Sequence, residues 1–155
     1  PARGAFGRMI DLVPASEEEA AAIIRAHAQE GRALAISGGD TRSGFGNAVE
    51  AEARLRSIAL SGIVAYNPGE MVMTARAGTP IAEVEAALAE NGQMMAFEPM
   101  DHRALMGTSG EPTIGGVFAA NVSGPRRLVA ERRATACSAS VSSMARARSS
   151  RPAAA

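Results

Sequence analysis

The feature that most limits what this chain can fold into is a short apolar run that ends in a glycine-rich loop. Residues Ala33 to Ile36 are apolar and few, which favours a buried strand. The next ten residues, Ser37 to Gly46, include four glycines. Such a loop turns several backbone N–H groups inward and lets an anion approach without meeting a Cβ atom. We therefore predict a strand followed by an anion-binding loop, with a flexible surface loop as the alternative.

Side chains of this loop add to its capacity to bind an anion. Thr41 and Ser43 carry hydroxyl groups, and Arg42 carries a positive charge, so a pyrophosphate is a natural guest. The loop is neither a P-loop, because no Gly-Lys-Ser/Thr follows, nor the Gly-x-Gly-x-x-Gly fingerprint. The predicted ligand is therefore a phosphorylated molecule held by a different kind of loop.

Strands and helices alternate along the rest of the chain, which predicts an α+β fold. Apolar alternation and turn residues bound the strands, and capping residues bound the helices. Ser16 and Glu19 form the expected capping box of the first helix, and a turn is expected at Asn67. Thr79 is the expected N-cap of the second helix, with Pro80 in its first position. Residues 93–112 show no clear period. The predicted strands lie at residues 10–13, 33–36, 54–58, 62–66 and 70–77, and the predicted helices at residues 16–31, 79–92 and 113–121.

A second glycine motif opens the last predicted helix. Gly115 and Gly116 follow Thr113 and Ile114, and without side chains they would expose the N-terminal amides of the helix to a phosphate. The alternative is that these glycines let the helix pack tightly against a neighbour. Taken in isolation, the motif favours close packing over phosphate binding.

The sequence shows no catalytic constellation and no metal site. His27 lies inside the first predicted helix and His102 in an irregular stretch, and neither has a Cys or carboxylate partner at the spacing of zinc ligands. The catalytic residues therefore stay unknown at this stage.

Composition argues against several other classes of protein. The 16 basic and 16 acidic residues cancel, and aromatic residues make up 3% of the chain, so neither nucleic acid nor a membrane surface is an expected partner. No apolar run reaches the roughly 20 residues of a transmembrane helix. The single cysteine, Cys137, excludes an internal disulfide and suggests a reducing compartment, which we take to be the cytoplasm.

Three segments together resemble the PCMH-type flavin adenine dinucleotide (FAD) binding domain of the vanillyl-alcohol-oxidase family. The segment Ile36 to Gly44 resembles its pyrophosphate loop, and Ala77 to Pro80 resembles the turn that begins the second half of its nucleotide site. The segment Thr113 to Asn121 resembles the Gly-Gly stretch beside the flavin. Residues 94–99 and 121–127 further resemble the FAD-binding subunits of bacterial glycolate oxidases.

The resemblance implies a set of FAD contacts and a class of activity. The implied cofactor-binding residues are Ser37, Gly38, Gly39, Asp40, Thr41, Arg42, Ser43 and Gly44 in the loop, with Gly78, Thr79, Thr113, Gly115, Gly116, Asn121 and Gly124. Relatives that tether the flavin through a histidine carry it where this chain has Asp40, so FAD should be bound non-covalently. The implied activity is oxidation of a small 2-hydroxy acid such as glycolate. The implied partners are other subunits of such a complex, including an iron–sulfur subunit.

Domain boundaries follow from the changes in composition. We expect residues 1–8 to be a leader or mis-assigned start, residues 9–129 to be the N-terminal part of the FAD-binding domain, and residues 130–155 to be a disordered tail. The expected domain is incomplete.

The genetic code allows a set of codons for residues 142–154 that, translated from the third base of the first codon, encodes Val-Asn-Gly-Glu-Gly-Glu-Ile-Ile-Lys-Ala-Gly-Gly. This peptide resembles the sequence that the family has at this point. This pattern suggests a one-base frame slip near residues 130–132, and rereading the gene tests it.

Two alternatives remain open on the sequence. The chain could be a non-catalytic remnant of such a subunit, because its tail is out of character. It could also be a nucleic-acid-binding protein with an arginine-rich arm, although the neutral body of the chain speaks against this.

Overall fold

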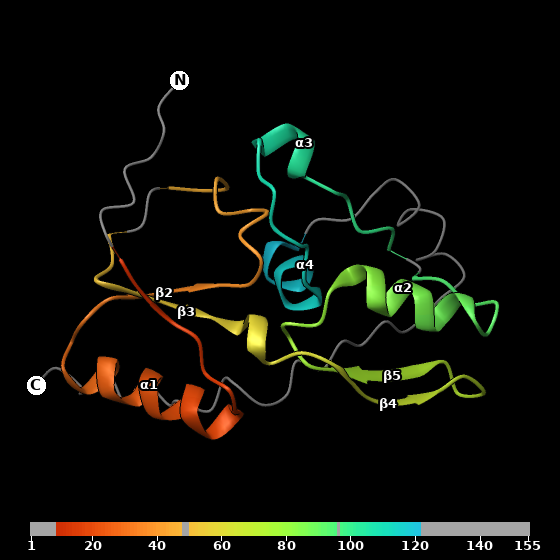
Figure 1. Ribbon diagram of the computed structural model, residues 1–155, viewed down its shortest axis with the longest axis horizontal. Coiled ribbons are helices and arrows are strands. Elements are labelled where there is room, and N and C mark those ends of the chain that lie inside the picture. The colour runs from red at the N-terminus through yellow and green to blue at the C-terminus, as the bar shows by residue number, and fades with distance from the viewer. Residues whose placement is uncertain (1–8, 48–49, 96, 122–155) are drawn as a thin grey trace, which may run out of the picture.

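The computed structural model describes residues 9–47, 50–95 and 97–121. It has both helices and strands, which confirms the mixed fold class (Figure 1). The predicted leader at residues 1–8, the predicted tail at residues 130–155 and the predicted site residue Gly124 lie outside the described residues.

The first part of the chain forms a parallel sheet with one covering helix. Its strands are β1 (Ile10–Leu12), β3 (Ala53–Arg56) and β2 (Leu34–Ser37), in that spatial order, with Leu55 opposite both Leu12 and Ile36. Helix α1 (Glu17–Gln29) connects β1 to β2, which run in the same direction on either side of β3, so the chain crosses over between them. The predicted capping box is confirmed: Glu19 N donates to Ser16 Oγ, and Glu19 Oε2 accepts from Ala15 N.

The core of this unit lies between α1 and one face of the sheet. Ala20, Leu55 and Leu60 are buried together, and Ile23, Ile24 and Leu34 pack against them. Since successive side chains of a strand point to opposite faces, Arg54 and Arg56 stand on the other face of β3 from Leu55. One face of the sheet is thus apolar and partly covered by the helix, with Ile10 and Ile36 left exposed, while the other carries arginines.

A hairpin and a second helix follow. After a short 3-10 helix, η1 (Ser57–Ala59), strands β4 (Ile63–Asn67) and β5 (Val72–Ala75) pair in antiparallel fashion. The predicted strand at residues 54–58 is therefore too long, because the chain turns at Ser57. The predicted turn at Asn67 is present, and Gly69 N donates to its Oδ1 atom at 3.2 Å.

Helix α2 (Ile81–Ala89) begins differently from the prediction. Its N-cap position is Pro80, and no side chain caps it. Thr79 is fully buried, and its hydroxyl instead donates to Arg76 O at 2.6 Å and accepts from Gly62 N at 3.0 Å. The expected N-cap role of Thr79 was wrong, because its hydroxyl is occupied in joining the two ends of the hairpin.

Two short helices complete the described chain. Helix α3 (Arg103–Met106) lies in the stretch for which no period was visible, and α4 (Ile114–Ala120) lies within the predicted last helix. Thr113 caps α4 by accepting from Gly116 N, and Asn121 ends it with a left-handed φ of 48°. Figure 1 shows α4 at the centre of the molecule, between the parallel sheet and α2.

Candidate functional site

The glycine loop, residues 38–46, leaves the sheet at the carboxyl end of β2. Ligands of parallel sheets bind at this edge, where the loops that follow the strands converge. Ser37 is the last residue of β2, and its Oγ atom is buried with no hydrogen-bond partner among the described residues. The predicted loop therefore starts where the fold class expects a ligand.

The backbone of the glycine loop offers a run of free donors. Across the part of the chain that the structure describes, no hydrogen bond is donated by the backbone N–H groups of residues 38–44. The run ends where Phe45 N donates to Arg42 O at 3.0 Å, and within it Asp40 adopts a left-handed φ of 60°. Successive amides around a left-handed residue form concave sites for anions. The loop therefore has the donors that a diphosphate needs.

Arg42 directs its guanidinium group toward the second half of the chain. Its Nη2 atom donates to Met100 O at 2.8 Å, and its Nη1 atom to Thr41 Oγ1 at 3.4 Å. Its Nε atom is buried and has no partner among the described residues. Burial lowers the pKa of Arg42 from its ordinary value, while the nearby Asp101 carboxylate opposes this shift. A partly desolvated cation with a free donor favours an anion beside it.

The hydroxyl groups of the loop are engaged in different ways. Thr41 is buried, with 4% of its surface exposed, and its Oγ1 atom accepts from Arg42. Ser43 is exposed, and its hydroxyl donates to Asp40 O at 3.2 Å. In this conformation the Ser43 hydroxyl is therefore not free to donate to a phosphate as expected, because it closes a turn of the loop itself.

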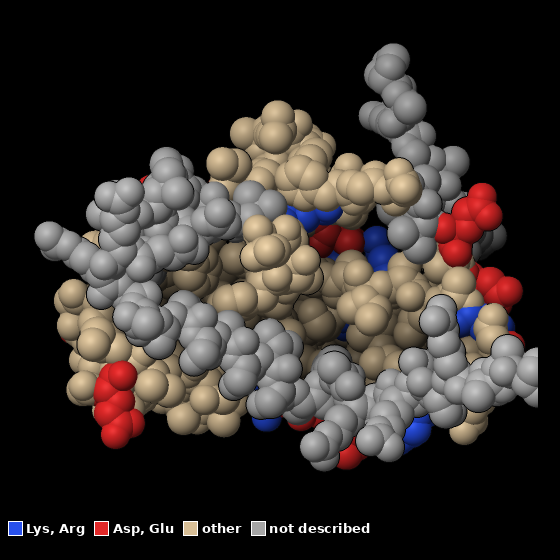
Figure 2. Space-filling model, turned by 180° about the vertical axis from the view of Figure 1, so that it is seen from behind, with Lys and Arg blue, Asp and Glu red and all other residues tan. Residues whose placement is uncertain are grey.

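Asp40 belongs to an ion-pair network that spans the sheet. Arg54 Nη1 lies 2.7 Å from Asp40 Oδ2, and Arg54 Nε lies 2.8 Å from Asp11 Oδ1. Arg56 adds longer pairs to both carboxylates, at 3.6 Å and 3.8 Å. The hydrogen bond from Arg54 lowers the pKa of Asp11. On the face seen in Figure 2, acidic and basic side chains gather in a hollow near the middle of the molecule.

The predicted turn at residues 77–80 lies against the first turn of α4. Gly78 has no room for a side chain, because a Cβ atom there would overlap Ser57 O. Ile114 N donates to Thr79 O and Gly115 N donates to Ala77 O, both at 2.9 Å. Residues 77–79 and the start of α4 are thus joined directly by backbone hydrogen bonds.

These bonds decide between the two interpretations of the Gly-Gly segment. Besides the amides of Ile114 and Gly115, Gly116 N donates to Thr113 Oγ1 at 3.3 Å and Val117 N to Thr113 O at 3.1 Å. The interpretation in which this helix exposes its N-terminal amides to a phosphate does not hold, because each of these amides has a partner within the protein. A Cβ atom on Gly115 would lie 2.8 Å from Ala77 O. The glycines serve close packing, which was the alternative.

The three motifs nevertheless meet in space. A Cβ atom on Gly38 would overlap the Thr113 side chain, and one on Gly39 would overlap Glu111 O. A Cβ atom on Gly116 would lie 3.7 Å from Arg42 Nη1. The glycine loop therefore rests on the start of α4, which rests in turn on residues 77–79. Asn121, at the far end of α4, is the one described candidate that these contacts do not place near the loop.

Sequence reasoning missed the segment that faces the glycine loop. Residues 100–111 run along it, with contacts from Gly110 to Gly39, from Met100 to Arg42 and from His102 to Phe45. His102 Nδ1 and Thr108 Oγ1 are buried without a hydrogen-bond partner among the described residues. This stretch has no periodic pattern, so no local signal could have shown that it lies beside a loop some sixty residues earlier.

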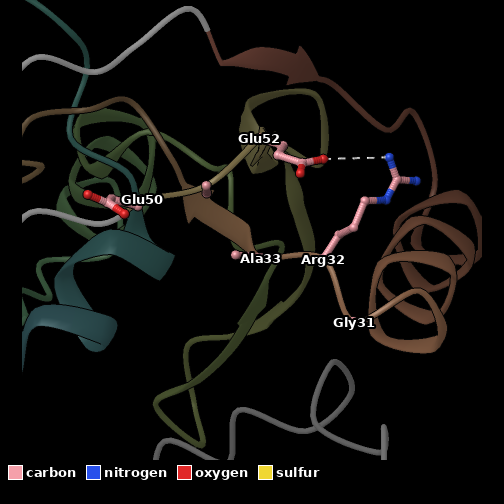
Figure 3. Close-up of a pocket in the computed structure, with 6 residues that line it drawn as sticks. Gly31, Arg32, Ala33, Glu50 and Glu52 are labelled. Atoms are coloured by element: carbon pink, nitrogen blue, oxygen red, sulfur yellow. Dashed lines mark ion pairs between the residues drawn. The ribbon is translucent and has the colours of Figure 1, made fainter.

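Another concave region lies away from this site. A cavity of about 380 Å³ is lined by Gly31, Arg32, Ala33, Glu50, Ala51 and Glu52, and Arg32 pairs with Glu52 at 3.8 Å across it (Figure 3). These residues precede β2 and β3, so the cavity lies at the amino end of the parallel sheet, opposite the glycine loop. Within the described ranges, no group of His, Cys, Asp and Glu side chains could hold a metal ion. Among the same residues, no helix has the length and apolarity to span a membrane.

Comparison with known proteins agrees with this geometry. The family described as the FAD binding domain matches residues 10–141, a range that continues beyond the boundary predicted at residue 129. The glycolate oxidase subunit GlcE of Escherichia coli (strain K12) is 39% identical over 94 residues, which is 61% of this chain. The aligned region spans 25% of that relative. The chain thus belongs to the family of PCMH-type FAD binding domains.

Proposed function

We propose that this chain binds FAD and that the glycine loop holds the diphosphate. The free amides of residues 38–44 carry this proposal, because each is an unused donor at the edge of a parallel sheet. The unpartnered Nε atom of Arg42 and Oγ atom of Ser37 add two further buried donors at the same place. Buried polar groups without partners are rare in folded proteins, so a ligand that satisfies several at once fits this loop.

The other predicted residues divide into two groups. Gly78, Thr79, Thr113, Gly115 and Gly116 support the loop through close backbone packing, and we propose that they shape the site rather than donate hydrogen bonds to the phosphates. For Asn121 and Gly124 the proposal of a flavin contact rests on the resemblance alone.

We propose a non-covalent flavin. Asp40 stands where tethering relatives carry a histidine, and its carboxylate is engaged by Arg54. A carboxylate cannot form the histidyl link, so affinity must come from hydrogen bonds and packing. The network also neutralises Asp40, which limits its repulsion of a diphosphate nearby.

We further propose that this protein oxidises a small 2-hydroxy acid such as glycolate. The similarity to GlcE supports this proposal. The flavin, when bound, supplies the hydride chemistry, and the protein supplies binding and orientation. Because that relative is named as a subunit, we propose that the protein works with other subunits. The proposal that one of them is an iron–sulfur protein rests on the resemblance, and the proposal of a cytoplasmic location rests on the single cysteine.

Titration of the 155-residue chain with FAD, followed by flavin absorbance and fluorescence, tests the binding proposal. Riboflavin, which lacks the diphosphate, is the matched control ligand. The proposal predicts saturable binding of FAD and much weaker binding of riboflavin. Equal affinities would show that the loop does not hold the diphosphate. Absence of binding would favour the alternative that the chain is a non-functional remnant.

Reduction of the bound flavin by glycolate, without oxygen, tests the substrate class separately.

A further inference from the structure

The segment that faces the glycine loop contains one histidine with unusual surroundings. His102 is 2% exposed, whereas its neighbours Asp101 and Arg103 are exposed and pair with each other at 2.7 Å. The chain thus turns a histidine inward between two charged residues that face water. The Nδ1 atom of His102 is buried and has no hydrogen-bond partner among the described residues.

The inward face of His102 meets the glycine loop. Its ring lies 4.9 Å from the ring of Phe45, at 83°, which is the favoured edge-to-face arrangement of an aromatic pair. Phe45 is 42% exposed and follows directly on the free amides. Its own amide donates to Arg42 O, so the position of Phe45 is coupled to the turn that carries Arg42.

Other contacts hold the same two segments together. Arg42 Nη2 donates to Met100 O at 2.8 Å, and a Cβ atom on Gly44 would lie 3.3 Å from Met106 Sδ. Among these contacts His102 is the one whose side chain is buried, and its carbonyl oxygen accepts from Met106 N to start α3. The imidazole therefore packs residues 100–106 against residues 42–45, so the position of one segment restricts the position of the other.

We propose that His102 is a positioning residue for the glycine loop: its ring packs on Phe45 and fixes residues 42–45 in the conformation that leaves the amides of residues 42–44 free. This inference rests on the proposed diphosphate site for its functional meaning. Its structural part, that His102 orders residues 42–47, stands separately. Because the ring acts by packing, a phenylalanine at this position should fulfil the same role. It should also remove the energetic cost of a buried nitrogen without a partner.

The test compares His102→Ala, His102→Phe and Val84→Ala in the 155-residue chain. Val84 is buried in α2, so its truncation lowers stability without touching the loop. Backbone order parameters of residues 42–47, from NMR relaxation of the amides, and the dissociation constant for FAD are measured for each variant. We expect His102→Ala to lower the order parameters of residues 42–47 selectively and to weaken FAD binding about two- to tenfold, the usual range of an aromatic pair. His102→Phe should match the wild type in both, and Val84→Ala should show no selective change at the loop.

Two results would overturn the inference. One is unchanged order parameters at residues 42–47 in His102→Ala. The other is loss of FAD affinity in His102→Phe with normal order parameters, which would show that a ring nitrogen, and not packing, is what matters. A wild-type chain that fails to bind FAD would contradict the proposed function, and the comparison of order parameters would still decide the role of His102.

Discussion

Arg54 Nη1 donates to Asp40 Oδ2 at 2.7 Å and thereby ties the glycine loop to the central strand of the parallel sheet. The same arginine donates through Nε and Nη2 to both carboxylate oxygens of Asp11, so one side chain links β1, β3 and the loop. Asp40 sits in a left-handed conformation that few residues other than glycine adopt readily. The ion pair holds this residue at the turn of the loop.

Replacing Asp40 with asparagine should loosen this connection without changing the turn. Asparagine tolerates the left-handed conformation, so the main change is the loss of the charge that faces Arg54. The two side chains are 26% and 22% exposed, and we expect the free energy of unfolding to fall by about 1 kcal/mol. Urea denaturation measures this change. An unchanged midpoint would show that the pair does not stabilise the loop.

Arg42→Ala should raise the dissociation constant for FAD substantially while changing the free energy of unfolding little. It removes the donor to Met100 O and the cation that stands beside the free amides. A charge-assisted hydrogen bond to phosphate supports an effect of about tenfold or more on the dissociation constant. Arg25→Ala, on the exposed side of α1, removes the same charge and is the control. Equal effects of the two variants on the dissociation constant would show that Arg42 acts only through its contribution to the net charge.

Thr79→Val should destabilise the protein although it barely changes the volume. The hydroxyl of this fully buried residue joins Gly62 and Arg76, and valine would leave Gly62 N and Arg76 O without that partner. We expect a loss of about 1–3 kcal/mol in the free energy of unfolding, measured by urea denaturation. Thr79→Ser keeps the hydroxyl and should recover most of this stability. Equal stability of Thr79→Val and the wild type would contradict the assigned role.

The Asp101 carboxyl group should titrate at low pH. Hydrogen bonds from the side chain and the backbone of Arg103 lower its pKa to about 2. Because the pKa is lowered in the folded state, the stabilisation is present above the ordinary aspartate pKa and is lost as pH falls toward about 2. Carboxyl-carbon NMR measures this pKa, and Arg103→Ala should raise it toward the ordinary value. A titration of Asp101 near the ordinary value in the wild type would refute the pairing.

Local patterns predicted the elements that position the loop. The apolar run at residues 33–36 and the capping box at Ser16 are short-range signals, and the structure places β2 and α1 there, with boundaries shifted by one or two residues. The glycines at positions 38 and 39 were predicted to let an anion approach. The space that their Cβ atoms would fill is instead taken by Thr113 and Glu111, which tertiary packing brings there and which the sequence did not show.

The errors share a physical cause. Thr79 and Gly115 lie in segments whose sequence fits a helix start, but tertiary partners use the groups that a cap or a phosphate would need. His102 could not be assigned, because its burial depends on contact with Phe45 from a distant loop. The frame slip predicted near residues 130–132 concerns residues outside the described part of the chain and remains a prediction for sequencing of the gene.

The most direct measurement of the central claim is a two-dimensional amide NMR spectrum of the chain recorded with and without FAD. If the glycine loop holds the diphosphate, the largest shifts on FAD addition belong to the amides of residues 38–44, while those of Ile114 and Gly115 move little because they already donate to Thr79 O and Ala77 O. FAD binding with unshifted loop amides, or with the largest shifts at residues 114–116, would contradict the account.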